Sequence, residues 1–161
     1  MSGGVPRLPE RGFAAVVLHS PKHAANVGSV LRNAHCFGAS LVAYTGHRYA
    51  GSVTDTTKAY RNIPLQHWPE VFHGPGIPHD CVPVAVDLVD GAVSLYNFVH
   101  PTSALYIFGP EDGTLGKAVL DRCKHQVMIP TDLPLNLATT TGCVLMLRHK
   151  QIMERRRRMA A

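Results

Sequence analysis

Short, continuous runs of apolar residues alternate along the chain with segments whose apolar residues recur at helical spacing. The continuous runs predict five buried strands, at Phe13–Leu18, Leu41–Thr45, Val82–Asp87, Ala104–Phe108 and Gln126–Ile129. Helical spacing and capping residues predict helices at Asn26–Phe37, Ser94–Val99 and Thr114–Cys123, and a long last helix that begins near Asn136. This alternation predicts an α/β domain with a mostly parallel sheet and helices on both faces.

The remaining segments do not change this architecture. Residues 1–12 form a Gly/Pro-rich lead that we expect to be flexible. The region Gly46–Asp80 is irregular, with possible short helices near Lys58 and at Pro69–Phe72. No internal repeat or linker is visible, so the 161 residues are predicted to form a single domain, 1–161.

Composition adds a basic tail to the picture. Apolar residues make up 45% of the chain and charged residues 17%, which is typical of a folded protein rather than a disordered one. The formal net charge is +5, and residues 148–161 hold all of that excess, with Glu154 as their single acid. This basic end of the last helix, which includes Arg155–Arg158, is either a contact surface for a polyanion or a helix end whose cations suit the helix dipole.

The cysteines and the apolar stretches bear on the compartment. Cys36, Cys81, Cys123 and Cys143 are scattered on apolar segments without a CxxC pair, so we expect buried, reduced thiols. The longest stretch without Asp, Glu, Lys or Arg, residues 91–110, contains polar residues and glycines that exclude a membrane span. The N-terminus lacks the pattern of a signal peptide, and we expect a cytoplasmic protein.

The stretch Ile129–Gly142, reading IPTDLPLNLATTTG, is the first candidate for a ligand site. Pro130 and Pro134 stiffen the loop that follows an apolar strand, and Asn136 is a good N-cap for the helix behind it. Ligands of parallel sheets bind beyond the carboxyl ends of the strands, where this loop is expected. The alternative is an ordinary strand-to-helix corner.

The loop Phe108–Gly116, reading FGPEDGTLG, is the second candidate. Its spacing fits neither a Walker A motif nor the GxGxxG dinucleotide signature. The adjacent carboxylates of Glu111 and Asp112 would also repel phosphate. Glycines beside acids better suit a neutral or cationic ligand that lies against the backbone.

The start of the first helix is the third candidate. Asn26 is predicted to cap this helix, Gly28 to leave open space, and Arg32 to lie one turn on from Gly28 on the same face. An arginine beside an open notch can hold a phosphate. The alternative is a solvated arginine on a polar face.

The ten histidines invite a metal hypothesis, which the spacing does not support. His73, His79 and Cys81 lie in a turn-rich segment, and no second ligand pair has the spacing of a structural zinc site. No GxSxG elbow is present, and no cysteine stands in a nucleophile motif. We therefore predict no metal.

Taken together and in order, the three stretches resemble the three motifs of the SPOUT superfamily, in its branch of S-adenosylmethionine-dependent RNA 2′-O-ribose methyltransferases. The first of them reads NVGSVLRNAHCFGA over residues 26–39, and the resemblance extends from the first strand to the last helix. It implies methyl transfer from S-adenosylmethionine to RNA, a deep C-terminal trefoil knot, and a homodimer with sites near the subunit interface. The uncharged stretch Thr140–Leu147 fits burial in such an interface or in the chain's own core.

Residue roles follow from the resemblance by position. It implies a cofactor pocket formed by Val86, Gly109, Ile129, Leu135 and Leu137. The catalytic arginine matches Arg32, and the other polar motif positions match Asn26, Glu111 and Asn136. Because a guanidinium keeps its proton, we expect Arg32 to grip a phosphate and orient the 2′-hydroxyl rather than act as a base.

One position departs from the family pattern, and several alternatives remain open. Pro134 stands where the family commonly has serine, which removes one possible hydrogen bond to the cofactor or the loop. The compact chain resembles members that act on tRNA, which we favour over rRNA. The alternatives are an rRNA 2′-O-methyltransferase, a base methyltransferase and a non-catalytic knotted RNA-binding protein.

Overall fold

A computed structural model describes residues 12–49 and 61–161. In this part of the chain seven strands form one sheet of order β3-β2-β1-β6-β4-β7-β5, in which every neighbouring pair is parallel. The strands are β1 (Phe13–Leu18), β2 (Leu41–Tyr44), β3 (Leu65–His67), β4 (Val82–Val86), β5 (Val93–Ser94), β6 (Ser103–Phe108) and β7 (His125–Met128). The helices are α1 (Ala24–Cys36), α2 (Lys117–Leu120), α3 (Leu137–Ala160) and the 3₁₀ helix η2 (Leu95–Asn97). The predicted α/β architecture is confirmed, and the trefoil knot stays a prediction.

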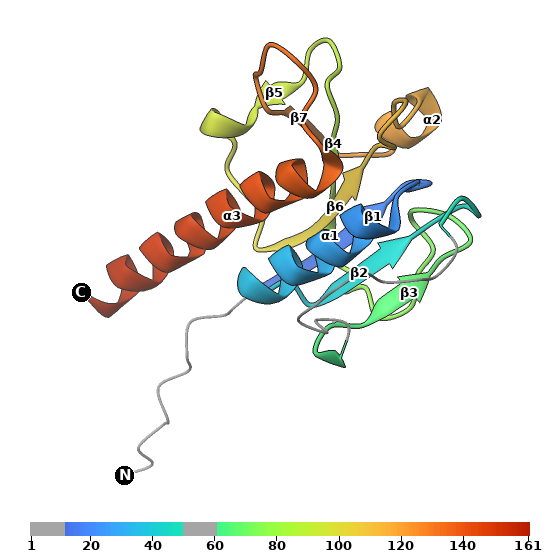
Figure 1. The fold of residues 1–161 in the computed structure, drawn as a ribbon. Coiled ribbons are helices and arrows are strands. Elements are labelled where there is room, and N and C mark those ends of the chain that lie inside the picture. Colours follow the sequence, from blue (N-terminus) through green and yellow to red (C-terminus); the bar gives the residue numbers. More distant parts are fainter. Residues whose placement is uncertain (1–11, 50–60) are drawn as a thin grey trace.

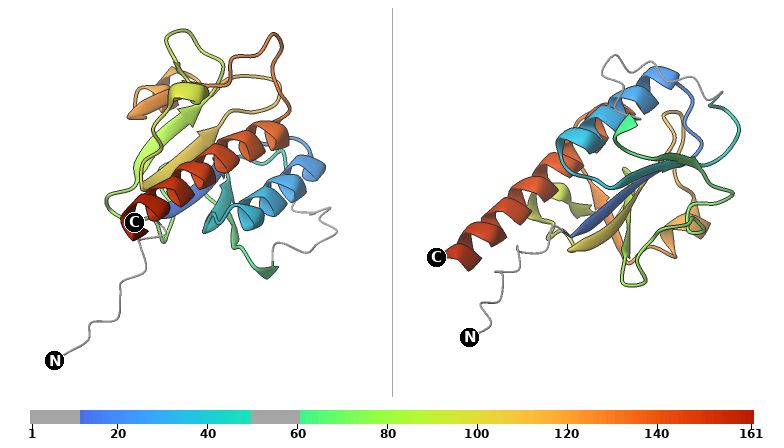
Figure 2. Two further views of the ribbon diagram at one scale, coloured as in Figure 1. Left: turned by 90° about the vertical axis from the view of Figure 1, so that its left-hand side faces the viewer. Right: turned by 90° about the horizontal axis from the view of Figure 1, so that it is seen from below.

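The sheet has two hydrophobic faces, and successive side chains of a strand point to opposite faces. Ala14, Val16 and Leu18 of β1 pack beneath α1 and α3, which lie side by side on one face (Figures 1 and 2). Ala15 and Val17 point to the other face, which the chain between β3 and β4 and the short α2 cover. Because the central strands β1 and β6 are buried on both sides, their sequences are continuous apolar runs instead of alternating ones.

The register of the central strands places their carboxyl ends at one edge. Leu18 of β1 and Val86 of β4 both pair with Phe108 of β6, and Val86 pairs with Val127 of β7. The loops that follow these strands therefore leave the sheet together. This edge is where a ligand of a parallel sheet is expected.

Several predicted elements differ from the observed ones. The sequence analysis missed β3, and Pro69–Phe72 is a bend and turn instead of a helix. The possible helix near Lys58 lies outside the described residues, as do residues 1–11. Thr114–Cys123 contains only the four-residue α2, and the expected helix at Ser94–Val99 is only η2, whose first turn Ser94 caps by accepting from the amide of Tyr96.

The basic end of α3 is partly structural. Arg148 is 3% exposed, and its Nη2 donates to the carbonyls of Phe13 at 3.2 Å and Thr102 at 3.0 Å. Arg155 donates to the carbonyl of His100 at 2.9 Å. Arg148 therefore fits neither of the two interpretations of residues 148–161, a polyanion contact or a helix-dipole cation, because its buried guanidinium fixes α3 to the sheet.

The four cysteines are free thiols, but none is buried as expected. Cys36 is exposed on α1, and the other three are partly covered. Burial raises the pKa of Cys81 and of Cys123 to about 11. In residues 12–49 and 61–161 no group of His, Cys, Asp and Glu side chains could hold a metal ion. No described helix is both long and apolar enough to cross a membrane.

Candidate functional site

A pocket of about 380 Å³ lies at the carboxyl edge of the sheet, between the loops that follow β4, β6 and β7. Its apolar lining consists of Val86, Leu88, Phe108, Pro110, Met128, Ile129, Pro134, Leu135 and Leu137. The other lining residues are Asp87, Gly109, Glu111, Asp112, Gly113, Thr114, Thr131 and Thr140. A volume of this size and a mostly apolar wall are typical of pockets that hold small organic ligands.

The structure brings together all five residues that the resemblance assigns to a cofactor. They come from the end of β4, the loops after β6 and β7 and the start of α3, and all line this one pocket: Val86, Gly109, Ile129, Leu135 and Leu137. Their binding of a cofactor stays a prediction.

Asp87 connects two of the pocket loops and was missed by the sequence analysis. Its Oδ1 accepts a hydrogen bond from the amide of Leu88 at 2.8 Å, and its Oδ2 accepts from the amide of Leu115 at 2.7 Å. A side chain at Gly109 would place Cβ 3.3 Å from Asp87 Oδ2, so glycine lets the two loops approach closely. The signal in the sequence was an acid at the end of a predicted buried strand, and that signal alone does not specify a partner.

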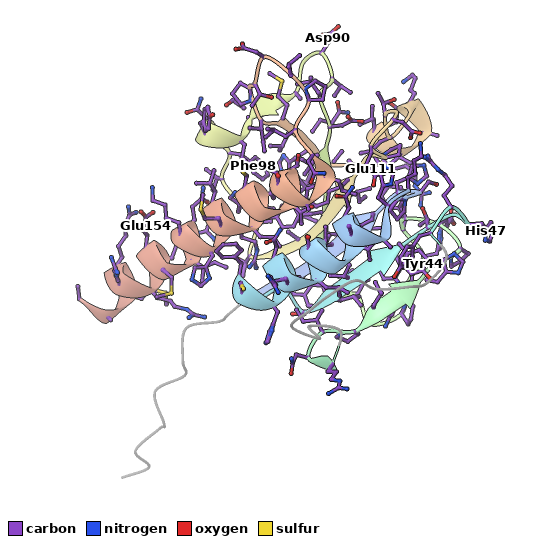
Figure 3. The ribbon with its side chains drawn as sticks, in the orientation of Figure 1. Tyr44, His47, Asp90, Phe98, Glu111 and Glu154 are labelled. Atoms are coloured by element: carbon purple, nitrogen blue, oxygen red, sulfur yellow. The ribbon has the colours of Figure 1, made fainter. Side chains whose placement is uncertain are left out.

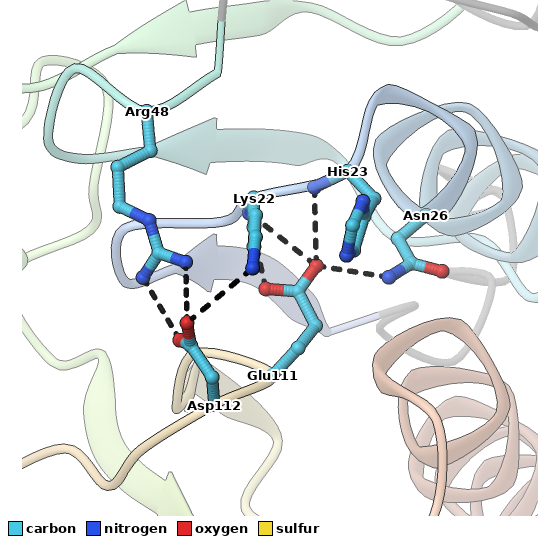
Figure 4. A network of polar contacts seen from close by, with 6 residues as sticks. All are labelled: Lys22, His23, Asn26, Arg48, Glu111 and Asp112. Carbon is cyan, nitrogen blue, oxygen red and sulfur yellow. Dashed lines mark hydrogen bonds and ion pairs between the residues drawn. The ribbon is translucent and has the colours of Figure 1, made fainter.

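Glu111 holds the amino end of α1 (Figure 4). Its carboxylate accepts from the amide of Lys22 at 3.0 Å, from the amide of His23 at 3.4 Å and from Asn26 Nδ2 at 2.9 Å. Burial by itself raises the pKa of Glu111, but these hydrogen bonds hold that pKa below its ordinary value. His23 occupies the N-cap of α1 without a capping side chain, so Glu111 supplies acceptors that the helix start lacks.

Asn26 does not cap α1 as predicted. It is the third residue of the helix and is buried, where its amide donates to Glu111 and its Oδ1 accepts from Asn136 Nδ2 at 2.9 Å. Asn136 is the N-cap of α3, as predicted, and its Oδ1 accepts from the amides of Ala138 at 2.8 Å and Thr139 at 3.3 Å. Glu111, Asn26 and Asn136 thus form one chain of hydrogen bonds across the three motifs, and any catalytic role for them stays a prediction.

Arg32 lies on α1, six residues after Asn26. It is exposed on α1, and it is not among the residues that line the pocket of its own chain. Gly28, one turn earlier, is buried, so the predicted open notch is wrong. Any ligand that Arg32 holds must therefore approach from the outer surface of α1.

A shallow groove runs between α1 and α3. Its lining includes Ser29, Asn33, Thr139, Gly142 and Met146. Asn33 Nδ2 donates to the carbonyl of Ala138 at 2.9 Å, and the absence of a side chain at Gly142 allows this close packing. Within the predicted interface stretch, the side chains of Thr141, Val144 and Leu145 belong to the chain's own interior, whereas Met146 is 48% exposed.

The charge of Asp112 is already paired. Arg48, from the segment after β2, donates from Nη1 to Oδ1 at 2.9 Å and from Nη2 to Oδ2 at 2.8 Å, and Lys22 Nζ lies 3.9 Å from Oδ2 (Figure 4). The Arg48 guanidinium holds the pKa of Asp112 below its ordinary value. Both acids of the loop thus face donors of this chain, which the sequence analysis did not anticipate.

Comparisons with solved structures give the same fold repeatedly. AviRb, a SpoU methyltransferase from Streptomyces viridochromogenes, aligns with a TM-score of 0.76 at 24% identity over 92% of this chain and 63% of AviRb. AviRb with AdoMet gives a TM-score of 0.74 at 25% identity, over 92% and 64%. A further structure, which offers structural insights into the 2-OH methylation of C/U34 on tRNA, aligns with a TM-score of 0.76 at 23% identity. The alignment covers 89% of this chain and 99% of the other chain. The chain thus spans less than two thirds of AviRb.

The sequence itself carries a family signature. No curated protein sequence matches the chain. The sequence model of the SpoU rRNA Methylase family, however, matches residues 14–146, a range that contains nearly all of the sheet, the complete pocket and the Glu111 network. This confirms the resemblance that the three motifs indicated, and the chain belongs to the SpoU rRNA methylase family.

Proposed function

We propose that this protein transfers a methyl group from S-adenosylmethionine to a ribose 2′-hydroxyl of RNA, with tRNA favoured over rRNA. Family membership supports RNA methylation. The observation that carries the proposal is the pocket at the carboxyl edge of the sheet, which unites residues of the second and third motif stretches with the loop after β4. The preference for tRNA is supported by the similar structure that concerns 2-OH methylation of tRNA, because the alignment covers 99% of that chain.

The pocket fits S-adenosylmethionine by its chemistry. Apolar walls such as Ile129, Leu135 and Leu137 suit an adenine ring, and Gly109 leaves the backbone accessible to it. When bound, the cofactor supplies a methyl group on a positively charged sulfur. Pro134 lines the same pocket and offers no hydroxyl, so loop stiffness is its contribution there.

Arg32 is proposed to act on the RNA. A guanidinium keeps its proton at neutral pH, so its role is to bind a phosphate and to hold the 2′-hydroxyl in line for displacement. Positioning of this kind supplies a large part of the acceleration in a transfer between two bound substrates.

We further propose a homodimer in which Arg32 of one copy serves the pocket of the other. Three observations support this arrangement: Arg32 is exposed, it does not line its own pocket, and the groove between α1 and α3 carries the exposed apolar Met146. A second copy seated on this groove would cover Met146.

The experiment is methyl labelling with identification of the product. Purified protein is incubated with labelled S-adenosylmethionine and unmodified tRNA or rRNA transcripts, and the RNA is digested to nucleosides. We expect label in a 2′-O-methyl nucleoside from tRNA. Label in a base would contradict ribose methylation, and label only from rRNA would overturn the substrate preference. A protein that binds RNA but not the cofactor in calorimetry would be a non-catalytic RNA-binding protein.

A further inference from the structure

Four rings meet at the carboxyl ends of β2 and β3. His67 stacks on Tyr44 with ring centroids 4.8 Å apart and an interplanar angle of 22°. His47 meets the edge of His67 at 5.5 Å, and Tyr49 meets Tyr44 edge-on at 4.9 Å. We name Tyr44, His47, Tyr49 and His67 the ring cluster. The network around Glu111 does not use any of these rings.

The two histidines of the ring cluster are exposed but held in place. His47 and His67 are exposed, Tyr44 is half-buried, and Tyr49, which packs edge-on against Tyr44, is only 6% exposed. The His67 ring is fixed by a 2.9 Å contact between its Nε2 and the carbonyl oxygen of Gly46. Gly46 has a φ of +77°, and a Cβ there would lie 2.6 Å from Ser20 Oγ, so this turn requires glycine. The rings therefore present a preorganised surface to an incoming molecule.

Arg48 connects the ring cluster with the pocket. His47 is followed by Arg48, whose guanidinium pairs with Asp112 of the pocket wall (Figure 4). Figure 3 shows Tyr44 and His47 on the same side of the molecule as Glu111. A polymer that places one nucleotide at the pocket can therefore extend across the rings with a neighbouring nucleotide.

We propose that the ring cluster stacks on an unpaired RNA base next to the nucleotide that is methylated, an inference that rests on the proposed function. RNA-binding proteins read single strands by stacking splayed bases on aromatic or histidine rings. Phosphate binding is less favoured here, because the nearby cations already face a carboxylate of this chain. Arg48 pairs with Asp112, and Lys22 lies close to the same carboxylate. What the surface offers is ring faces.

The test measures binding of an unmodified tRNA transcript and of a short single-stranded RNA at low and high salt. The double variant His47→Ala/His67→Ala is expected to weaken binding about fivefold or more at both salt concentrations, because stacking is not screened as phosphate contacts are. The single variant His67→Ala is expected to lose affinity, whereas His67→Phe keeps a ring and is expected to retain most of it. His79→Ala, an exposed histidine before β4, is the matched control and should bind as the unchanged protein does.

The outcomes separate this inference from the proposed function. If the unchanged protein methylates RNA but the double variant binds and reacts normally, the stacking surface is wrong and the proposed function stands. Equal losses for His67→Phe and His67→Ala would also overturn it, since the contact to Gly46 would then matter and the ring would not. If RNA binding depends on the rings but no methyl transfer occurs, the inference stands and the proposed function fails. For the active protein we expect the RNA KM to rise in the double variant while kcat is retained.

Discussion

At the level of single residues, Glu111 binds three residues at the start of α1. Its carboxylate joins the loop after β6 to the amides of Lys22 and His23 and to the side chain of Asn26. We predict that Glu111→Gln lowers the free energy of unfolding by about 1 kcal/mol, because a neutral amide replaces a charged acceptor of several hydrogen bonds. Urea denaturation followed by the fluorescence of the single tryptophan, Trp68, measures the change.

The same substitution should change the response to acid. The pKa of Glu111 is lowered in the folded chain, so its stabilisation is complete above its ordinary pKa and is lost as pH falls through the lower, folded value. Glu111→Gln removes that part of the acid sensitivity. Asp112→Asn is the control, because the Asp112 carboxylate is exposed and pairs with the side chains of Arg48 and Lys22 instead of with backbone amides at the start of α1. Equal effects of the two variants on stability would contradict a special role for Glu111.

The sequence predicted the residues of this network better than their contacts. Glu111, Asn26 and Asn136 were all selected from motifs, but Asn26 was assigned to a cap that His23 occupies. Their hydrogen bonds join residues 85 and 110 positions apart, and a local pattern contains no information on such pairs. Arg48 and Asp87 were missed for the same reason, since their partners Asp112 and Leu115 lie in a distant loop.

At the level of elements, the second half of α3 is fixed to the sheet by a buried polar cluster. His100 is 2% exposed, its Nδ1 lies 2.6 Å from the hydroxyl of Tyr106, and its amide donates to Gln151 of α3 at 3.0 Å. Burial, and then the charges of Arg148 and Arg155, lower the pKa of His100 from 6.5 to about 4. The histidine is therefore neutral in the folded protein at neutral pH.

This cluster predicts acid sensitivity of the whole fold. Between pH 6.5 and about 4 the unfolded chain binds a proton that folded His100 does not, so stability falls as pH decreases through this range and is independent of His100 above it. We expect a loss on the order of 2 kcal/mol, measured by urea denaturation at several pH values. His100→Gln should flatten this dependence. An unchanged pH profile in the variant would show that another group is responsible.

Elements were predictable from the sequence where burial is continuous. The apolar runs of β1, β4 and β6 read as strands because both of their faces are covered. In contrast, β3 contains only Leu65, Gln66 and His67, and it is a strand because it pairs with β2 at the sheet edge. A pattern of three residues has no detectable period, so this strand depends on its tertiary partner. The same strand presents His67 to the ring cluster.

At the scale of the whole molecule, the separation of Arg32 from its own pocket is the feature to explain. Within the described residues the pocket is lined by the loops after β4, β6 and β7, whereas Arg32 is exposed on α1. If a second copy supplies the arginine, each pocket is completed by two chains. A twofold dimer then contains two equivalent sites that share their parts reciprocally.

Complementation tests this sharing. Arg32→Ala should be inactive alone and still bind S-adenosylmethionine, because the pocket is intact. Gly109→Val should be inactive alone because its side chain would enter the pocket beside Asp87 Oδ2. When the two variants are co-expressed with different tags and purified as a heterodimer, one site combines an intact pocket with an intact Arg32, so we expect about half of the unchanged activity. If each site belongs to one chain, both sites of the heterodimer are defective and methyl transfer stays absent.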